Sequence, residues 1–163
     1  FLDKNSGFDL VILPRDGNGA PTNYLATSYN ERVGSFSPNM KWIAYSSDES
    51  GKYQIYIAPF ATGSGKWQVS VDGGDVPRWM NNGKRLYYFT NDDKIMGVDV
   101  NESGTSLSPG RPYPVFSPAV PIARLFDVNS SGTLVLASVP NSRSIPSPIT
   151  LIDNWKQDAK TGE

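Results

Sequence analysis

The hydrophobic pattern of the chain has a period close to two residues along its whole length. Short runs in which apolar and polar side chains alternate are separated by turns rich in Gly, Asn, Asp, Ser and Pro. This alternation is typical of β-strands, whereas no segment shows the three-to-four-residue spacing of an amphipathic helix. The pattern predicts strands at residues 8–13, 23–27, 32–36, 41–46, 53–58, 66–71, 76–79, 84–90, 94–100, 112–117, 123–129, 133–139 and 149–152.

The pattern also repeats itself. Residues 3–14, DKNSGFDLVILP, align without a gap on residues 48–59, DESGKYQIYIAP, at an offset of 45. Residues 36–45, FSPNMKWIAY, align on residues 79–88, WMNNGKRLYY, at an offset of 43, and residues 128–137, VNSSGTLVLA, follow at a further 49. Repeats of this length with four short strands are typical of β-propeller blades.

The repeats predict an all-β fold, a partial β-propeller of about three four-stranded antiparallel blades. A β-sandwich is the alternative, but it has no need of copies matched in register. We expect Phe36, Trp79 and Val128 at equivalent positions of the core between adjacent blades. The blades span residues 1–155, and residues 156–163 form a polar tail.

The number of predicted strands is too small for a closed ring. About thirteen strands make a little over three blades, whereas closed propellers have about four to eight. The end sheets of such a fragment expose apolar faces and strand edges. We therefore expect the chain to associate with another copy or to pack on further blades.

Composition excludes several classes of function. The 163 residues carry a net charge of −1 without a basic cluster, which argues against nucleic acid as a partner. There is no His and no Cys, so triads that need His, thiolate metal sites and disulfides are all excluded. Carboxylate- or lysine-based catalysis stays open. No apolar run reaches the roughly 18 residues that a membrane span needs, so no direct membrane insertion is expected of this segment.

Three short motifs resemble ligand sites only in part. DKNSGFD, at residues 3–9, has the start of a calcium loop, but Pro14 stands where the bidentate Glu is required. TGSGKW, at residues 62–67, lacks the first Gly of a phosphate loop. The pair Asp92 and Asp93 lies in a predicted hairpin turn. We therefore predict turns at all three places, and no catalytic residue, metal or cofactor.

Two stretches resemble a known family. FSPN followed by WIAYSSD resembles the repeat signature of TolB-like, WD-like β-propellers, and GKWQVSVDGGDVPRW with NGKRLYYF resembles a bacterial version of it. The resemblance covers residues 8–155 and departs from the family where Asn39 and Met40 replace the usual Asp-Gly turn. It implies the C-terminal part of a propeller attached to a bacterial Ser/Thr kinase or winged-helix regulator, on the extracytoplasmic (periplasmic) side of the membrane.

The resemblance predicts a function of binding rather than catalysis. We expect a non-catalytic module that binds a protein or peptide through loops on the funnel face, where Arg32, Asp75 and Arg124 occupy equivalent repeat positions. Ordinary solvated loops explain the same charges equally well. An accessory propeller that gates a prolyl oligopeptidase-like hydrolase is the alternative function. An autonomous propeller enzyme, such as a glycosidase or lactonase, is disfavoured because the chain lacks His and a convergent set of carboxylates.

Overall fold

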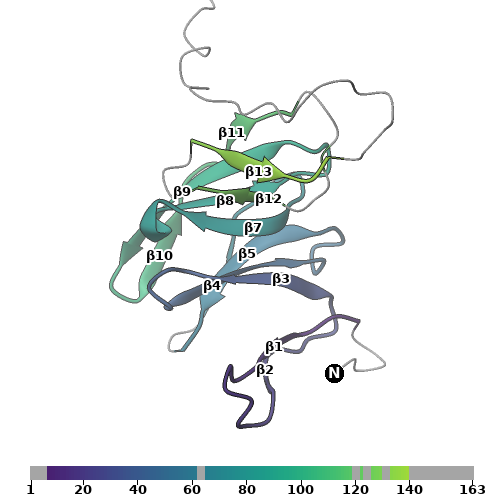
Figure 1. Cartoon of the computed structure of the whole chain (residues 1–163), viewed down its shortest axis with the longest axis vertical. Helices are drawn as coiled ribbons and strands as arrows, with labels where there is room; N and C mark the ends of the chain where they lie inside the picture. The colour runs from purple at the N-terminus through teal and green to yellow at the C-terminus, as the bar shows by residue number, and fades with distance from the viewer. Residues whose placement is uncertain (1–6, 62–64, 119–121, 123–125, 130–132, 140–163) are drawn as a thin grey trace, which may run out of the picture.

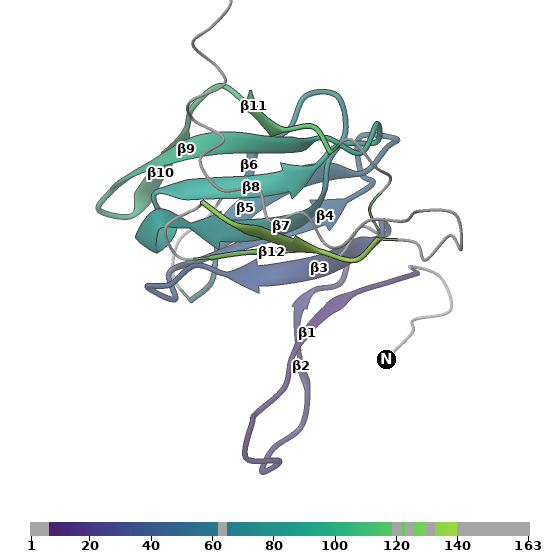
Figure 2. The same cartoon turned by 45° about the horizontal axis from the view of Figure 1, so that its top comes forward.

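The computed structural model describes residues 7–61, 65–118, 122, 126–129 and 133–139. They form four antiparallel sheets that follow one another in chain order (Figure 1, Figure 2). Sheet 1 is the pair β1 (Leu10–Ile12) and β2 (Thr22–Leu25), and sheet 4 is the pair β12 (Phe126–Val128) and β13 (Val135–Ala137). Sheet 2 contains β3 (Glu31–Phe36), β4 (Trp42–Ser47), β5 (Gln54–Pro59) and β6 (Trp67–Gln68).

Sheet 3 is the widest. It contains β7 (Asp75–Met80), β8 (Arg85–Phe89) and β9 (Ile95–Ser103), with β10 (Ser106–Pro109) and β11 (Tyr113–Phe116) paired to different parts of β9. The short 3-10 helix η1 (Asn81–Gly83) links β7 to β8. The predicted all-β class is confirmed. The predicted strand at residues 149–152 and the polar tail lie outside the described residues.

The sheets pack face to face through three clusters of apolar side chains. Between sheets 2 and 3 lie Trp42, Ala44, Ile55, Ile57, Val69, Leu86, Tyr88, Val98, Val100 and Leu107. Between sheets 3 and 4 lie Val76, Met80, Tyr87, Phe89, Ile95, Ile122, Phe126 and Val128. Between sheets 1 and 2 lie Ile43, Tyr45, Tyr56 and Ala58, with Leu10, Ile12, Tyr24, Leu25 and Phe60 packed against them.

Neighbouring residues on the central strands enter different clusters because successive side chains of a strand point to opposite faces. On β8, Tyr87 faces sheet 4 and Tyr88 faces sheet 2, and both are almost fully buried. Each buried aliphatic or aromatic side chain stabilises the stack by about 1.5–3 kcal/mol. The central strands are therefore apolar on both faces, which explains their nearly continuous hydrophobic sequences.

One strand is shorter than its sequence suggests. The predicted strand at residues 66–71 is paired only over β6, because the hydroxyl of Ser70 accepts the backbone N–H of Ile55 at 2.8 Å. The side chain of Gln54 also accepts the N–H of Gly73, at 3.0 Å, with its carbonyl oxygen. Side chains thus replace part of the backbone ladder at the edge of sheet 2.

Of the three residues expected between adjacent sheets, Phe36 is the exception. Trp79 packs against the cluster between sheets 2 and 3, and Val128 is buried between sheets 3 and 4. Phe36 remains 42% exposed, with Phe60 in edge-to-face contact at 4.9 Å. It lies opposite Ile43, on the face that packs on sheet 1. Among the described residues sheet 1 has only two strands, so no inner strand covers Phe36.

The four sheets do not close into a ring. Sheets 1 and 4, at the two ends of the stack, share no hydrogen-bonded strand pair among the described residues. The structure therefore shows several stacked antiparallel sheets, and the prediction of propeller blades is not confirmed by it.

Candidate functional site

Two of the three residues predicted to bind a partner bind each other. The Nη2 of Arg32, near the start of β3, lies 2.6 Å from the Oδ2 of Asp75, the first residue of β7. The guanidinium also lies 3.5 Å from the ring centre of Tyr53, and the Ser46 hydroxyl donates to the Oδ1 of Asp75 at 2.9 Å. Arg124 lies outside the described residues. A role of these side chains in binding a partner stays a prediction.

The pair links sheet 2 to sheet 3 at a point where both backbones are strained. Val33 and Val76 have φ values of 53°, in the left-handed region that a β-branched residue rarely adopts. Each lies in a β-bulge of its strand, between Arg32 and Ser35 in β3 and between Asp75 and Arg78 in β7. Strain repeated at equivalent positions persists only where the surroundings stabilise it. The ion pair and the burial of Val76 supply that stabilisation.

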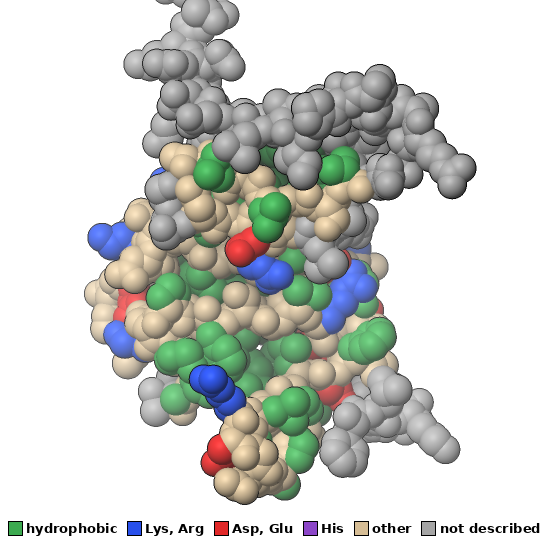
Figure 3. Space-filling view, viewed as in Figure 1, with side chains coloured by type: hydrophobic (Ala, Val, Ile, Leu, Met, Phe, Trp, Pro, Cys, Tyr) green, Lys and Arg blue, Asp and Glu red, His purple; other side chains and the backbone are tan. Residues whose placement is uncertain are grey.

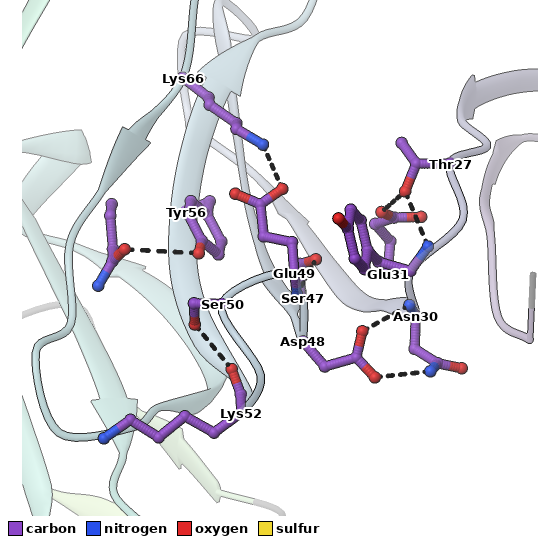
Figure 4. A network of polar contacts seen from close by, with 12 residues as sticks. Thr27, Asn30, Glu31, Ser47, Asp48, Glu49, Ser50, Lys52, Tyr56 and Lys66 are labelled. Atoms are coloured by element: carbon purple, nitrogen blue, oxygen red, sulfur yellow. Dashed lines mark hydrogen bonds and ion pairs between the residues drawn. The ribbon is translucent and has the colours of Figure 1, made fainter.

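Polar side chains at the same end of sheet 2 are also paired with one another (Figure 4). Asp48 accepts the backbone N–H of Asn30 at 2.8 Å and its side-chain amide at 2.6 Å. Glu31 is 2% exposed and accepts the Thr27 hydroxyl at 2.5 Å, while its Oε2 has no hydrogen-bond partner among the described residues. Burial raises the pKa of Glu31 because it disfavours the charged form. This end of the sheets mainly satisfies its own charges.

The opposite end of sheets 2 and 3 contains a polar groove of about 600 Å³. It lies between the β3–β4 turn, η1 and the last part of β9. Its lining residues are Ser37, Asn39, Trp42, Asn81, Asn82, Gly83, Lys84, Asp99, Val100, Asn101 and Glu102. A volume of this size is typical of small-molecule sites, although most of those are more apolar.

Glu102 ties the two sheets together along one wall of the groove. Its carboxylate accepts the ammonium of Lys41 at 2.5 Å, the amide of Asn39 at 2.8 Å and the indole N–H of Trp42 at 3.2 Å. The hydrogen bond from Lys41 is the main cause that lowers the pKa of Glu102, and those from Trp42 and Asn39 add to it. Glu102 is therefore ionised, and its hydrogen bonds hold this wall of the groove together.

A contact between two turns forms another part of the groove. Gly83 has a φ of 86°, and a Cβ built on it lies 3.4 Å from the Cδ of Pro38 in the β3–β4 turn. Asn81 and Asn82 also have positive φ values, of 48° and 55°, which Asn tolerates better than most residues. The predicted strands at residues 76–79 and 84–90 leave this Asn-Asn-Gly sequence as a turn, and its residues suited to positive φ are the sequence signal for this part of the groove.

The groove has polar groups that the chain does not use. Among the described residues, the side chains of Asn81, Asn82, Asn101 and Lys84 make no hydrogen bond or ion pair, and all four are exposed. Asp99, in contrast, accepts the Nε of Arg85 at 2.9 Å and the hydroxyl of Tyr113 at 3.2 Å. Amides offer both donors and acceptors, and an ammonium offers three donors. The free groups can therefore hydrogen-bond a hydroxylated ligand and attract a negative charge.

Nothing in the described part of the chain forms a metal centre. No group of three or more carboxylates lies close enough together there to hold an ion. The described residues also include no helix with the length and hydrophobicity to cross a membrane.

Comparisons with known proteins identify the fold rather than a family. No family model matches the chain, and no curated protein matches it. Among solved structures, the chain is similar to the crystal structure of a "putative 6-phosphogluconolactonase" from Bacteroides uniformis, with a TM-score of 0.53 and 19% sequence identity. The similarity covers 90% of this chain and 46% of that one, so the chain spans less than half the length of the similar protein.

These comparisons overturn two predictions from the sequence. The TolB-like assignment is corrected, because no family model supports it and the similar structure is described as a lactonase. The predicted non-catalytic module for a protein or peptide, with its alternative of a gate for a hydrolase, is corrected by the same finding. The short matches to the TolB-like signature consist of turn and strand residues that stacked sheets of other families also need. What the chain shares with a known protein is the stacked-sheet fold.

Proposed function

We propose that the polar groove binds a small hydroxylated anion, of the class of phosphorylated or carboxylated sugars. The observation that carries the proposal is the contrast between paired carboxylates and free donors. Asp99 and Glu102 are already bound by side chains of the chain itself. The side chains of Lys84 and three asparagines, in contrast, have no partner among the described residues. The charge left over for a ligand is therefore positive.

The chemistry of these groups favours that ligand class. An ammonium binds a phosphate or carboxylate through charge-assisted hydrogen bonds. Neutral amides bind hydroxyl groups without adding charge. The description of the similar structure as a 6-phosphogluconolactonase supports the same class of ligand.

We propose further that the four sheets are successive blades of a ring-like stack. The repeats of 43 to 49 residues support this, because they place matching strands in successive sheets. The positive φ of both Val33 and Val76 supports it too, since it marks the same bulge in two sheets. In such a stack the groove lies between two adjacent blades, at the hairpins that follow their first strands.

A binding experiment tests the proposed ligand. Glucose 6-phosphate and gluconate are titrated into the protein and followed by calorimetry or by NMR shifts of the asparagine amides, with glucose as the neutral control. We expect both anions to bind more tightly than glucose. Lys84→Gln removes one charge-assisted hydrogen bond, worth about 1.5–3 kcal/mol, and is expected to weaken anion binding roughly tenfold or more.

The chain offers a matched control for that variant. Lys52 is an exposed lysine in the β4–β5 hairpin, at the opposite end of sheet 2. Lys52→Gln changes the net charge equally and is expected to leave binding unchanged. Equal loss in both variants, or equal binding of glucose and the anions, would contradict a site at the groove. Release of acid from gluconolactone in the same samples tests the prediction that the chain is not an enzyme.

A further inference from the structure

In the part of the chain that the structure describes, the two end sheets of the stack contain complementary pairs of strands. Sheet 1 and sheet 4 each have two strands among the described residues, whereas sheets 2 and 3 have four and five. In the repeat alignment, residues 3–14 correspond to residues 48–59, so β1 is equivalent to β5. Residues 128–137 correspond to residues 79–88, so β13 is equivalent to β8 and, one repeat earlier, to β4. Within the described residues, sheet 4 thus has the counterparts of the first two strands of a unit, and sheet 1 has the counterparts of the last two.

The most exposed apolar side chains of these strands lie where the complete sheets are buried. Leu136 on β13 is 72% exposed, whereas its equivalents Tyr87 and Ala44 are 2% and 0% exposed. Leu13, which follows β1, is 65% exposed, whereas its equivalent Ala58 is 8% exposed. Figure 3 shows apolar side chains at the surface around the junction of sheets 1 and 2. The exposure therefore has the pattern of an interrupted core.

We propose that β13 of one copy of the chain pairs with β1 of a second copy, so that sheets 4 and 1 form one four-stranded sheet. The proposal rests on the arrangement of blades proposed above. The β4–β5 ladder places Ile43 opposite Ala58 and Ala44 opposite Ile57. The same register places Val135 opposite Leu13, and Leu136 opposite Ile12, of the second copy.

This register also directs each side chain to the correct face. Ile12 packs toward sheet 2, so Leu136 beside it faces sheet 2 of the second copy. Phe36 is 42% exposed on the face of sheet 2 that packs on sheet 1. In the proposed dimer, β12 of one copy lies opposite Phe36 of the other copy, as β3 lies opposite the equivalent Trp79 within a single copy. Leu13 joins Val135, which is 37% exposed, on the other face. One pairing thus covers four exposed apolar side chains.

The pairing is head-to-tail, so it gives either a ring or an open chain of copies. Two copies contribute two complete sheets each and share two composite ones, which makes six sheets, within the range of about four to eight for closed propellers. One copy corresponds to 46% of the similar solved structure, so two copies correspond to most of it. The geometry points to a closed dimer.

The mass of the full chain in solution, measured by light scattering and sedimentation, tests the proposal. We expect a dimer. Leu136→Glu introduces a charge at a site that is exposed in the single copy and covered in the dimer, and is expected to give a folded monomer with a dimer Kd raised by about a hundredfold or more. Val71→Glu is the matched control, because Val71 is 65% exposed and lies outside the proposed pairing.

Cross-linking tests the register. The chain has no cysteine, so the double variant Leu13→Cys with Val135→Cys has only the two introduced thiols. Mild oxidation is expected to give covalent dimers on a non-reducing gel, whereas Leu13→Cys with Val71→Cys is expected to give none. A monomeric wild-type chain overturns the proposal. A dimer that Leu136→Glu leaves intact, or long covalent chains of copies, overturns it equally. Ligand binding at the groove does not depend on any of these results.

Discussion

The two ends of sheets 2 and 3 use polar residues in opposite ways. At the end where β3 and β7 begin, Arg32, Asp75 and Glu31 are wholly or partly buried and bind other groups of the chain, although the Nε of Arg32 and the Oε2 of Glu31 have no hydrogen-bond partner among the described residues. At the end with the β3–β4 and β7–β8 turns, Glu102 is bound, but the exposed side chains of Lys84 and its neighbouring asparagines have no partner among the described residues. The charges that stand out in the sequence belong to the first end. The ligand site proposed above lies at the second.

This difference shows that residues at equivalent positions of a repeat can be predicted to lie close together in adjacent sheets, as well as to resemble each other. Arg32 and Asp75 are 43 residues apart, the same offset that relates β4 to β8. Equivalent positions on adjacent sheets lie side by side, so opposite charges at them form an ion pair. The offset in the sequence therefore predicts this ion pair, and the predicted role of Arg32 and Asp75 in binding a partner stays a prediction.

The largest expected effect is a difference in the free energy of unfolding between variants at the two ends. Asp75→Ala leaves Arg32 without its partner and removes the acceptor of Ser46, and breaking a buried pair of this kind costs about 3–5 kcal/mol. Because Arg32 is one-third exposed, we expect a value near the lower limit. Asp99→Ala, at a groove-end carboxylate whose side chain is 58% exposed, is expected to cost less than about 1 kcal/mol. Urea unfolding measures both, with an unchanged m-value as the check on two-state behaviour.

A double variant tests whether the ion pair itself causes this loss of stability. Replacing a buried ion pair with apolar side chains of similar size is often neutral, because the cost of desolvating both charges disappears. Arg32→Met with Asp75→Leu is therefore expected to recover most of the stability that Asp75→Ala loses. If Asp75→Ala lowers the free energy of unfolding no more than Asp99→Ala does, the polar contacts at the first end do not stabilise the fold more than those at the groove.

The strands and their repeats could be predicted from the sequence because each depends on local residues. Short runs of strand-forming residues located β3, β4, β5 and β8, and the Gly- and Asn-rich turns located their ends. The exposure of Phe36 could not be predicted in this way, since it depends on the number of strands in the preceding sheet. The equivalent Trp79 is covered because sheet 2 is complete.

The groove could not be predicted from local pattern either. Its wall depends on Glu102, which binds Asn39 across 63 residues of sequence. Glu102 lies beyond residues 94–100, where the predicted strand ends, whereas β9 continues to Ser103. Since no repeat relates the two residues, only the packing of sheet 3 on sheet 2 brings them together.

A smaller effect is expected from a backbone change at the groove. Gly83→Ala forces an L-residue to keep a φ of 86°, and it adds a Cβ close to Pro38. We expect a loss of about 1 kcal/mol in the free energy of unfolding. Gly51→Ala is the matched control, since Gly51 has a φ of 88° and no atom within 4 Å of the added Cβ. Thermal unfolding is expected to show a similar loss for both, while anion binding falls only for Gly83→Ala.

The smallest expected effect is an opposite pH dependence of the stability contributed by two glutamates. The pKa of Glu31 is raised, mainly by burial, and that of Glu102 is lowered, mainly by Lys41. A raised pKa in the folded state means that stability is lost as the pH rises from the unfolded value of about 4.3 through the folded pKa. A lowered pKa means that stability is present above about 4.3 and is lost as the pH falls through the folded pKa.

The two glutamates therefore give opposite slopes when each is compared with its glutamine variant. Between about pH 3 and pH 7, the stability of wild type minus Glu31→Gln is expected to fall, and that of wild type minus Glu102→Gln to rise. The change for Glu102 is expected to stay below about 1 kcal/mol, because its side chain is 28% exposed and solvent screens the pair with Lys41. Urea unfolding at several pH values measures both slopes. Slopes of the same sign would mean that both carboxylates lie in similar surroundings, and the contrast between a buried structural end and an open polar end would then not hold.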